Sequence, residues 1–202
     1  VSNYTMNNVE VWVNEMRLTG IDNHGGFAAL ARGEAQLADL GNISLAGAYT
    51  TFGYGGIDQR INQRSLNNIM QIDATTSLAL GKFIPKSAAI SLPFTAQYSN
   101  NTSTPEFDPN DLDVKLQDKI NQVSSKTEKD SIKNKSVDFS EVRGFAFNNV
   151  RKNRTGNAKP KPWNIENLGL SYAHSNSFKR NPVILQDNLN INKGALDYNY
   201  SL

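Results

Sequence analysis

The side chains best suited to catalysis or metal binding are few and widely spaced in this sequence. There are two histidines, His24 in the turn-like segment GIDNHGG and His174 in an alternating run, and there is no cysteine. No GxSxG, P-loop or HExxH pattern is present. The carboxylates fall mostly in turn-rich segments, so no acid–base pair can be assigned. The sequence therefore predicts no catalytic residue, no metal site and no cofactor, and we expect a protein that is not an enzyme.

Basic residues gather at two places. Arg60 and Arg64 are four residues apart, a spacing that puts both on one side of a short helix. Pairing with carboxylates explains them better than substrate binding. The segment RKNRTGNAKPKPW at 151–163 lacks aromatic residues interleaved on a strand, and its glycine and prolines indicate a solvated connection. With a net charge of only +2, we expect no nucleic-acid partner.

The elements that position the side chains are strands. Residues 70–98 contain two runs of alternating apolar and polar residues, separated by a turn-rich segment at 81–88, which predicts a β-hairpin with two unlike faces. Each strand has about 10 residues, close to the 9–11 of a tilted strand that crosses a bilayer. The apolar face holds Met70, Ile72, Leu78, Leu80, Ile90, Leu92 and Phe94. The polar face holds Gln71, Asp73, Ser77, Ser91, Thr95 and Gln97.

The same kind of pattern extends along the chain. It predicts strands near 9–18, 27–38, 43–52, 68–80, 89–99, 136–150, 164–178 and 189–202, with a bulge near Gly144. The long loop at 100–135 contains apolar residues at helical spacing, which predict one short amphipathic helix: Leu112, Leu116, Ile120 and Val123. The charged run SSKTEKDSIKNKS that follows predicts a mobile, solvated loop. The fold class is therefore all-β, an antiparallel meander of long amphipathic strands with one short helix in a long loop.

Composition narrows the class of protein. The 202 residues are 38% hydrophobic, with a mean hydropathy of −0.51. No apolar run approaches the roughly 18 residues of a membrane helix, which excludes a helical membrane protein but not a barrel, whose strands alternate. The absence of cysteine suits a periplasmic or outer-membrane protein. Val1 is not an initiator methionine, so we expect the chain to begin after processing or inside a longer protein.

Six stretches carry a resemblance to a known family. They are VEVWVNEMRLTGID (9–22), QLADLGNISLAGAYTTFGYGGIDQRINQRS (36–65), LGKFIPKSAAISLPFTAQYSN (80–100), DPNDLDVKL (108–116), NNVRKNR (148–154) and WNIENLGLSYAHS (163–175). In this order they resemble the SprA family, called Sov in oral relatives, of the type IX secretion system in Bacteroidetes. The resemblance spans nearly the whole chain and only a small part of the family's full length.

The resemblance implies a very large transmembrane β-barrel in the cell outer membrane that exports folded proteins and supports gliding motility in gliding species. Residues 1–202 would be a single segment of barrel wall, joined to the rest of the same barrel chain. Implied partners are outer-membrane lipid, secreted cargo proteins, a shuttle protein of the PorV type and a plug protein. On this hypothesis the apolar set of the 70–98 hairpin faces lipid and the polar set faces the aqueous lumen.

The alternative from the pattern alone is a soluble or surface-exposed β-domain that acts as a binding or adhesion module. Solubility without detergent would separate the two hypotheses. For a barrel, connection length predicts sidedness, because short turns lie in the periplasm and long loops outside. We then expect 39–42, 81–88 and 151–163 on the periplasmic side, and 53–67, 100–135 and 179–188 outside.

Overall fold

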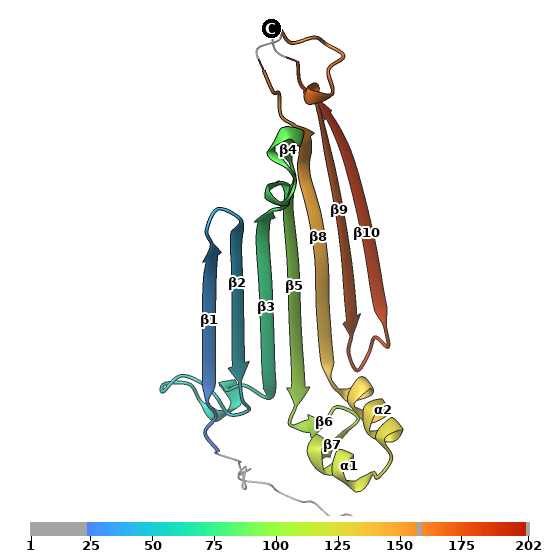
Figure 1. Cartoon of the computed structure of the whole chain (residues 1–202). Helices are drawn as coiled ribbons and strands as arrows, with labels where there is room; N and C mark the ends of the chain where they lie inside the picture. Colours follow the sequence, from blue (N-terminus) through green and yellow to red (C-terminus); the bar gives the residue numbers. More distant parts are fainter. Residues whose placement is uncertain (1–23, 157–158, 201–202) are drawn as a thin grey trace, which may run out of the picture.

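Long antiparallel strands dominate the structure, a computed structural model that describes residues 24–156 and 159–200. Each strand of the main sheet pairs with the next along the chain, in the order β1-β2-β3-β5-β8-β9-β10 (Figure 1). Their bounds are Ala28–Leu37 (β1), Gly41–Thr50 (β2), Asn67–Ala79 (β3), Pro93–Pro105 (β5), Asp138–Lys152 (β8), Leu168–Arg180 (β9) and Asp187–Tyr198 (β10). The all-β meander predicted from alternation is confirmed. The strand predicted at 9–18 lies outside the described residues.

The end of the sheet at β3 and β5 differs in detail from the predicted hairpin. A short 3-10 helix at Leu80–Phe83 (η2) and another at Lys86–Ala88 (η3) follow β3. The two-residue strand β4, Ile90–Ser91, then pairs with β8. Leu80 therefore lies in a helix and Leu92 between two strands, although the Leu80 N–H still donates to the Leu92 carbonyl at 2.9 Å. Gly81 and Pro85 end the alternation here.

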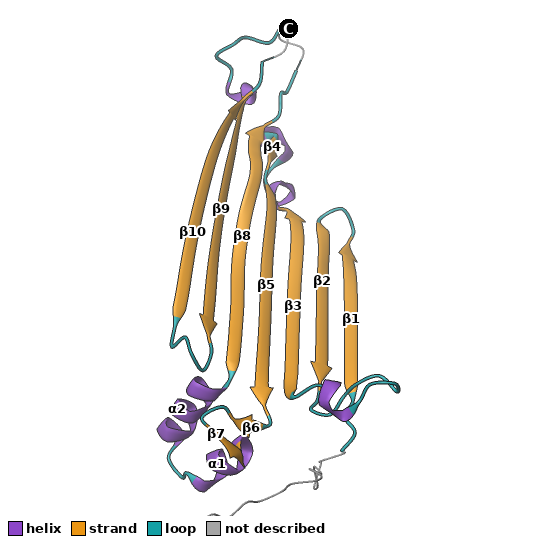
Figure 2. Ribbon diagram, turned by 180° about the vertical axis from the view of Figure 1, so that it is seen from behind, coloured by secondary structure: helices purple, strands orange, loops and turns teal. Residues whose placement is uncertain are grey.

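A helical cap, residues 106–137, replaces most of the loop predicted at 100–135. β5 continues to Pro105, and a small hairpin of Phe107–Asp108 (β6) and Asp111–Lys115 (β7) leads into two helices. These are Leu116–Gln122 (α1) and Lys126–Ser136 (α2). Figure 2 shows the cap at the end of the sheet where β5 ends and β8 begins. The prediction of one helix was wrong, because α2 forms from the charged run.

Helix α2 forms from a highly charged segment because of where its charges lie and what its one apolar residue contacts. Glu128 lies in its first turn and Lys133 and Lys135 in its last, which complements the helix dipole at both ends. Its one large apolar residue, Ile132, packs against the cap core formed by Leu116, Ile120 and Val137. The prediction of a mobile, solvated loop is wrong for this run, because tertiary packing stabilises a helix of weak amphipathicity.

The bulge in β8 lies five residues beyond the predicted place. The register shifts between Phe147 and Val150, and Asn149 takes a positive φ of 53°, which Asn tolerates better than most residues. The Asn149 N–H donates to Ser171 Oγ at 2.9 Å. Gly144, in contrast, pairs regularly with neighbours on both sides.

The remaining short elements lie between strands. Arg60 and Arg64 flank the 3-10 helix Ile61–Gln63 (η1), and Ile165–Asn167 (η4) precedes β9. Pairing of the two arginines with carboxylates stays a prediction. Within the described ranges, no helix is both long and apolar enough to cross a bilayer.

The only buried hydrophobic side chains among the described residues are three in the helical cap, Leu116, Ile120 and Val137. Neither face of the main sheet is covered by another described element (Figures 1 and 2). Within the described residues, β1 and β10 each pair on one side only. The side chains on both sheet faces are therefore available to meet a solvent, a lipid or another polypeptide.

Candidate functional surfaces

Strand register assigns every side chain of the sheet to one of two faces. Directly opposed residues in an antiparallel pair share a face. Leu78 opposes Phe94, and Ser77 opposes Thr95. The members of the two predicted sets that lie in β3 and β5 are thus on opposite faces. The first, called the apolar face, holds Met70, Ile72, Leu78 and Phe94, and the second, called the polar face, holds Gln71, Asp73, Ser77, Thr95 and Gln97. Two further members of the predicted sets, Ile90 and Ser91, lie in β4, where they oppose Lys152 and Arg151 of β8. Which face meets lipid stays a prediction.

The polar face is lined by hydroxyl and amide side chains. Ser99 Oγ donates to Asp73 Oδ1 at 2.6 Å, and Gln71 Nε2 donates to Asp73 Oδ2 at 2.7 Å. A shallow hollow of about 390 Å³ lies mainly over this face, between β2 and β9. Its lining includes Asn42, Thr75, Ser77, Thr95, Gln97 and Ser175. Such a surface binds water well and offers a passing protein few apolar contacts. Four large exposed apolar residues interrupt it, at 30, 69, 189 and 191.

The apolar face carries a cluster of rings at the level of Phe94. The centroids of Phe94 and Phe147 are 5.2 Å apart, and Phe145 lies 6.1 Å from Tyr172 and 5.5 Å from His174. The rings come from β5, β8 and β9, which the register brings together. His174 Nδ1 is 2.7 Å from Asn192 Oδ1, so this histidine belongs to a polar contact across β9 and β10. Among the described residues, no group of three His, Cys, Asp or Glu side chains can hold a metal.

The apolar band on this face runs obliquely across the strands. On β3 it extends from Met70 to Leu78, whereas on β9 it covers only Leu168 to Tyr172. Register places Leu78 level with Phe94, Phe147 and Tyr172. The band on β9 therefore begins at the level where the band on β3 ends, and it is displaced away from the helical cap. Figure 1 shows the strand ends stepping in the same direction from β3 to β10. Strands of membrane barrels tilt by roughly 35–45°, and a band level with the membrane then crosses successive strands at shifted registers.

Below the band, toward the helical cap, the same face becomes polar apart from Phe139 and Phe178, whose ring centroids are 5.9 Å apart. Glu141 forms an ion pair with Arg143 and accepts a hydrogen bond from Tyr98 Oη at 3.3 Å. Asn176 Nδ2 donates to Asn188 Oδ1 at 2.8 Å and to Asn190 Oδ1 at 2.6 Å. These groups satisfy one another on the sheet surface. This part of β8, β9 and β10 therefore suits water better than hydrocarbon.

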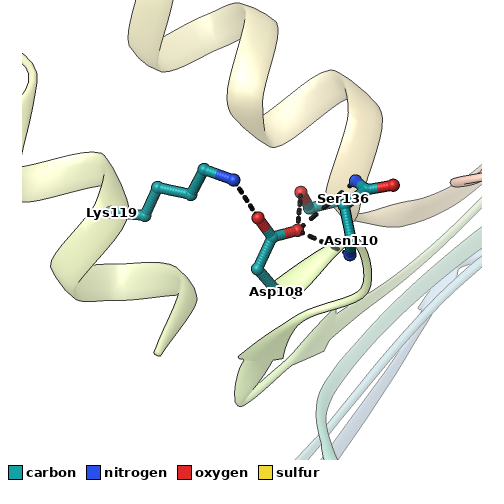
Figure 3. A network of polar contacts seen from close by, with 4 residues as sticks. All are labelled: Asp108, Asn110, Lys119 and Ser136. Carbon is teal, nitrogen blue, oxygen red and sulfur yellow. Dashed lines mark hydrogen bonds and ion pairs between the residues drawn. The ribbon is translucent and has the colours of Figure 1, made fainter. Parts of the chain in front are cut away.

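Asp108 joins the parts of the helical cap (Figure 3). Its side chain is buried, forms an ion pair with Lys119, and accepts hydrogen bonds from the Asn110 N–H at 3.1 Å and from Ser136 Oγ at 3.3 Å. Burial by itself raises the pKa of Asp108, but these donors outweigh it, so the pKa lies below the ordinary 3.8. No pattern in the sequence pointed to this residue as a structural centre. The Asp108-Pro109-Asn110 turn signals an Asx turn, but Lys119 and Ser136 could not be foreseen as partners.

Comparison with family models decides the family. The model SprA_N, described as motility related/secretion protein, matches residues 1–120. The chain belongs to this family. Comparison with curated proteins gives no match. The resemblance inferred from the sequence is confirmed, and the SprA_N description gives the chain a role related to secretion or motility. Such a role fits a membrane-associated location.

Proposed function

We propose that this SprA_N chain forms part of the wall of an outer-membrane channel that exports folded proteins and supports gliding motility in gliding species. The observation that carries the proposal is the two-faced sheet: an oblique apolar band on one face and a surface of hydroxyls and amides on the other. In a barrel wall, lipid covers the apolar band and water covers the polar face.

Among the described residues, no core lies under the sheet, which favours this proposal over a soluble binding or adhesion module. A soluble antiparallel sheet buries one face against other elements. Here many large side chains of the apolar band are exposed, among them Met70, Ile72, Leu170 and Leu196. The proposed role needs no catalysis. Cargo would pass the polar face, and a shuttle protein of the PorV type and a plug protein are proposed partners.

Neighbouring residues on β3 provide a matched test of the two faces. In the full-length protein, Ile72→Arg places a cation inside the apolar band, where it costs roughly 2–4 kcal/mol near the membrane midplane. Gln71→Arg places the same cation on the polar face, where water is available. We expect the first variant to be depleted from the outer membrane and to secrete little cargo, and the second to stay close to the parent.

Immunoblots of membrane fractions and of secreted cargo measure these outcomes. Equal loss in both variants would contradict the assignment of lipid to the apolar face. Recovery of the parent protein in the soluble fraction without detergent would favour the soluble binding module instead.

A further inference from the structure

The two ends of the main sheet differ in charge. The turn end, defined as 38–40, 80–92 and 151–167, has seven cations and two carboxylates: Lys82, Lys86, Arg151, Lys152, Arg154, Lys159 and Lys161 against Asp39 and Glu166. The loop end, defined as 51–66, 106–137 and 181–186, has eight of each. Both ends carry long connections, so length alone does not explain the difference. The net charge is therefore +5 at the turn end (seven minus two) and zero at the loop end (eight minus eight).

Most cations of the turn end are not neutralised by carboxylates of the described chain. Lys82 pairs with Asp39. Among the described residues, no ion pair engages Lys86, Arg151, Lys152 or Arg154, and all four are exposed. Three of them line a polar hollow of about 680 Å³ that also holds Glu166 and Asp197 of β10, so cations outnumber carboxylates there by three to two. Lys86 lines a second hollow of about 740 Å³ with Lys82 and Asp39. The turn end therefore presents accessible positive charge.

Exposed aromatic side chains lie among these cations. Trp163 is 78% exposed and Phe83 73%, and the Lys161 ammonium lies 5.7 Å from the centroid of the Trp163 ring. Tyr198 Oη donates to the Pro162 carbonyl at 2.8 Å. The upper end of the apolar band, at Leu168 and Leu170, adjoins this group. Aromatic and basic side chains at the border of an apolar band are typical of a membrane–water interface.

We propose that the turn end binds the anionic headgroups of phospholipids in the leaflet that it borders. This inference rests on the proposed barrel wall, because only then does the band place the turn end at headgroup depth. The headgroup phosphates supply the negative charge that the chain lacks here. An acidic protein would also match the charge, but exposed Trp163 and Phe83 beside an apolar band fit lipid better.

Photocrosslinking in the full-length protein tests the proposal locally. The protein carries p-benzoylphenylalanine at Phe83, or at Tyr49 on the apolar face near the loop end, in bilayers of equal phosphatidylglycerol and phosphatidylcholine. Mass spectrometry then measures the ratio of the two crosslinked lipids. We expect phosphatidylglycerol to be enriched about threefold at Phe83 and not at Tyr49. The enrichment should fall at high salt, as the Debye length shrinks from about 10 Å at 0.1 M to about 3 Å at 1 M.

Charge variants provide the matched control. Lys86→Gln, Arg151→Gln, Lys152→Gln and Arg154→Gln together should abolish the enrichment at Phe83 and leave the Lys82–Asp39 pair in place. The same number of changes on α2, Lys126→Gln, Lys129→Gln, Lys133→Gln and Lys135→Gln, should leave it unchanged. If the turn-end variant does not assemble, the salt dependence of the parent decides the matter.

The outcomes separate this inference from the proposed function. Equal capture of both lipids at Phe83 would overturn the headgroup site while leaving the barrel wall standing. A crosslink from Phe83 to a protein in intact cells, in place of lipid, would also overturn it. Absence of lipid crosslinks at both positions would contradict the barrel wall itself, and the headgroup site with it.

Discussion

At the scale of single residues, Asp108 is the group on which the helical cap most depends. It is buried and accepts hydrogen bonds from β6–β7, α1 and α2 together. Removing its charge leaves Lys119 without its carboxylate partner and weakens the contact to Ser136. A buried hydrogen-bonding group that loses its partners costs about 1–3 kcal/mol.

The lowered pKa of Asp108 predicts how the cap responds to acid. Its pKa in the folded chain lies below the unfolded value of 3.8. The carboxylate therefore stabilises the cap at neutral pH, and the contribution is lost as the pH falls below about 4, toward the folded pKa. The protection factors of the 106–137 peptides in the full-length protein, which correct for the slower intrinsic exchange in acid, should fall over this range. Asp108→Asn should have lower protection factors at pH 7 and lose less protection in acid, and an unchanged profile would contradict the assignment.

Gly41 shows a different constraint, set by the backbone. It begins β2 at φ +151°, and a Cβ built on it would lie 1.9 Å from the Ser77 carbonyl oxygen. Gly41→Ala should destabilise the β1–β2 hairpin by roughly 1–3 kcal/mol, since the chain must shift to fit the methyl group. Gly33→Ala is the control, because a Cβ there meets nothing within 4 Å. The change in gel mobility on heating measures how much of each variant has assembled. Equal assembly of the Gly41→Ala and Gly33→Ala variants would contradict the predicted backbone strain at Gly41.

At the scale of elements, the helical cap is the one part of the described chain with a core of its own. Leu116 is 2% exposed and packs with Ile120 and Val137, whereas Leu112 in the same cap is 74% exposed. The core is small, so the cap depends on few contacts. It also touches the end of β9, where Arg180 Nη1 donates to Asn134 Oδ1.

Truncating one leucine at a time tests the cap core. Leu116→Ala should destabilise the cap by about 2–5 kcal/mol, the usual cost of a cavity in a packed core. Leu112→Ala should have little effect, since its side chain is already in solvent. Limited proteolysis of the full-length protein at 124–135 provides the measurement. Cleavage at the same rate in both variants would show that the cap is not held by this core.

At the scale of the whole molecule, the connections fall at two ends of the sheet. The β1–β2 turn and the segments 80–92, 151–156 and 159–167 lie at the turn end, and 51–66, the helical cap and 181–186 lie at the loop end (Figure 1). The grouping predicted from alternating strand direction is therefore confirmed. The side of the membrane on which each end lies stays a prediction.

Labelling of intact cells tests that side. Barrels of this kind keep long loops outside, so a cysteine at Ser125 in the cap should react with an impermeant thiol reagent. A cysteine at Thr155 in the turn end should react only after the outer membrane is opened. The reverse pattern would invert the orientation while leaving the faces of the wall unchanged.

The sequence by itself determined the long strands of the described sheet and their two faces. Alternation has a period of two residues, and it assigned the faces of Leu78 and Ser77 before any pairing was known. Membership of the SprA_N family also followed from the order of local stretches. These features are local, so they can be read without knowing which strand lies beside which.

Features that depend on contacts between residues distant in sequence were decided only by the tertiary structure. The bulge at 148–149 arises between β8 and β9, and it could not be located from Gly144 alone. Helix α2 is charged along its length, and its packing on Leu116 and Ile120 stabilises it. The obliquity of the apolar band appears only when register sets Leu78 level with Tyr172, nearly 100 residues later. The Asp108 network likewise joins side chains up to 28 residues apart, a distance at which local pattern carries no information.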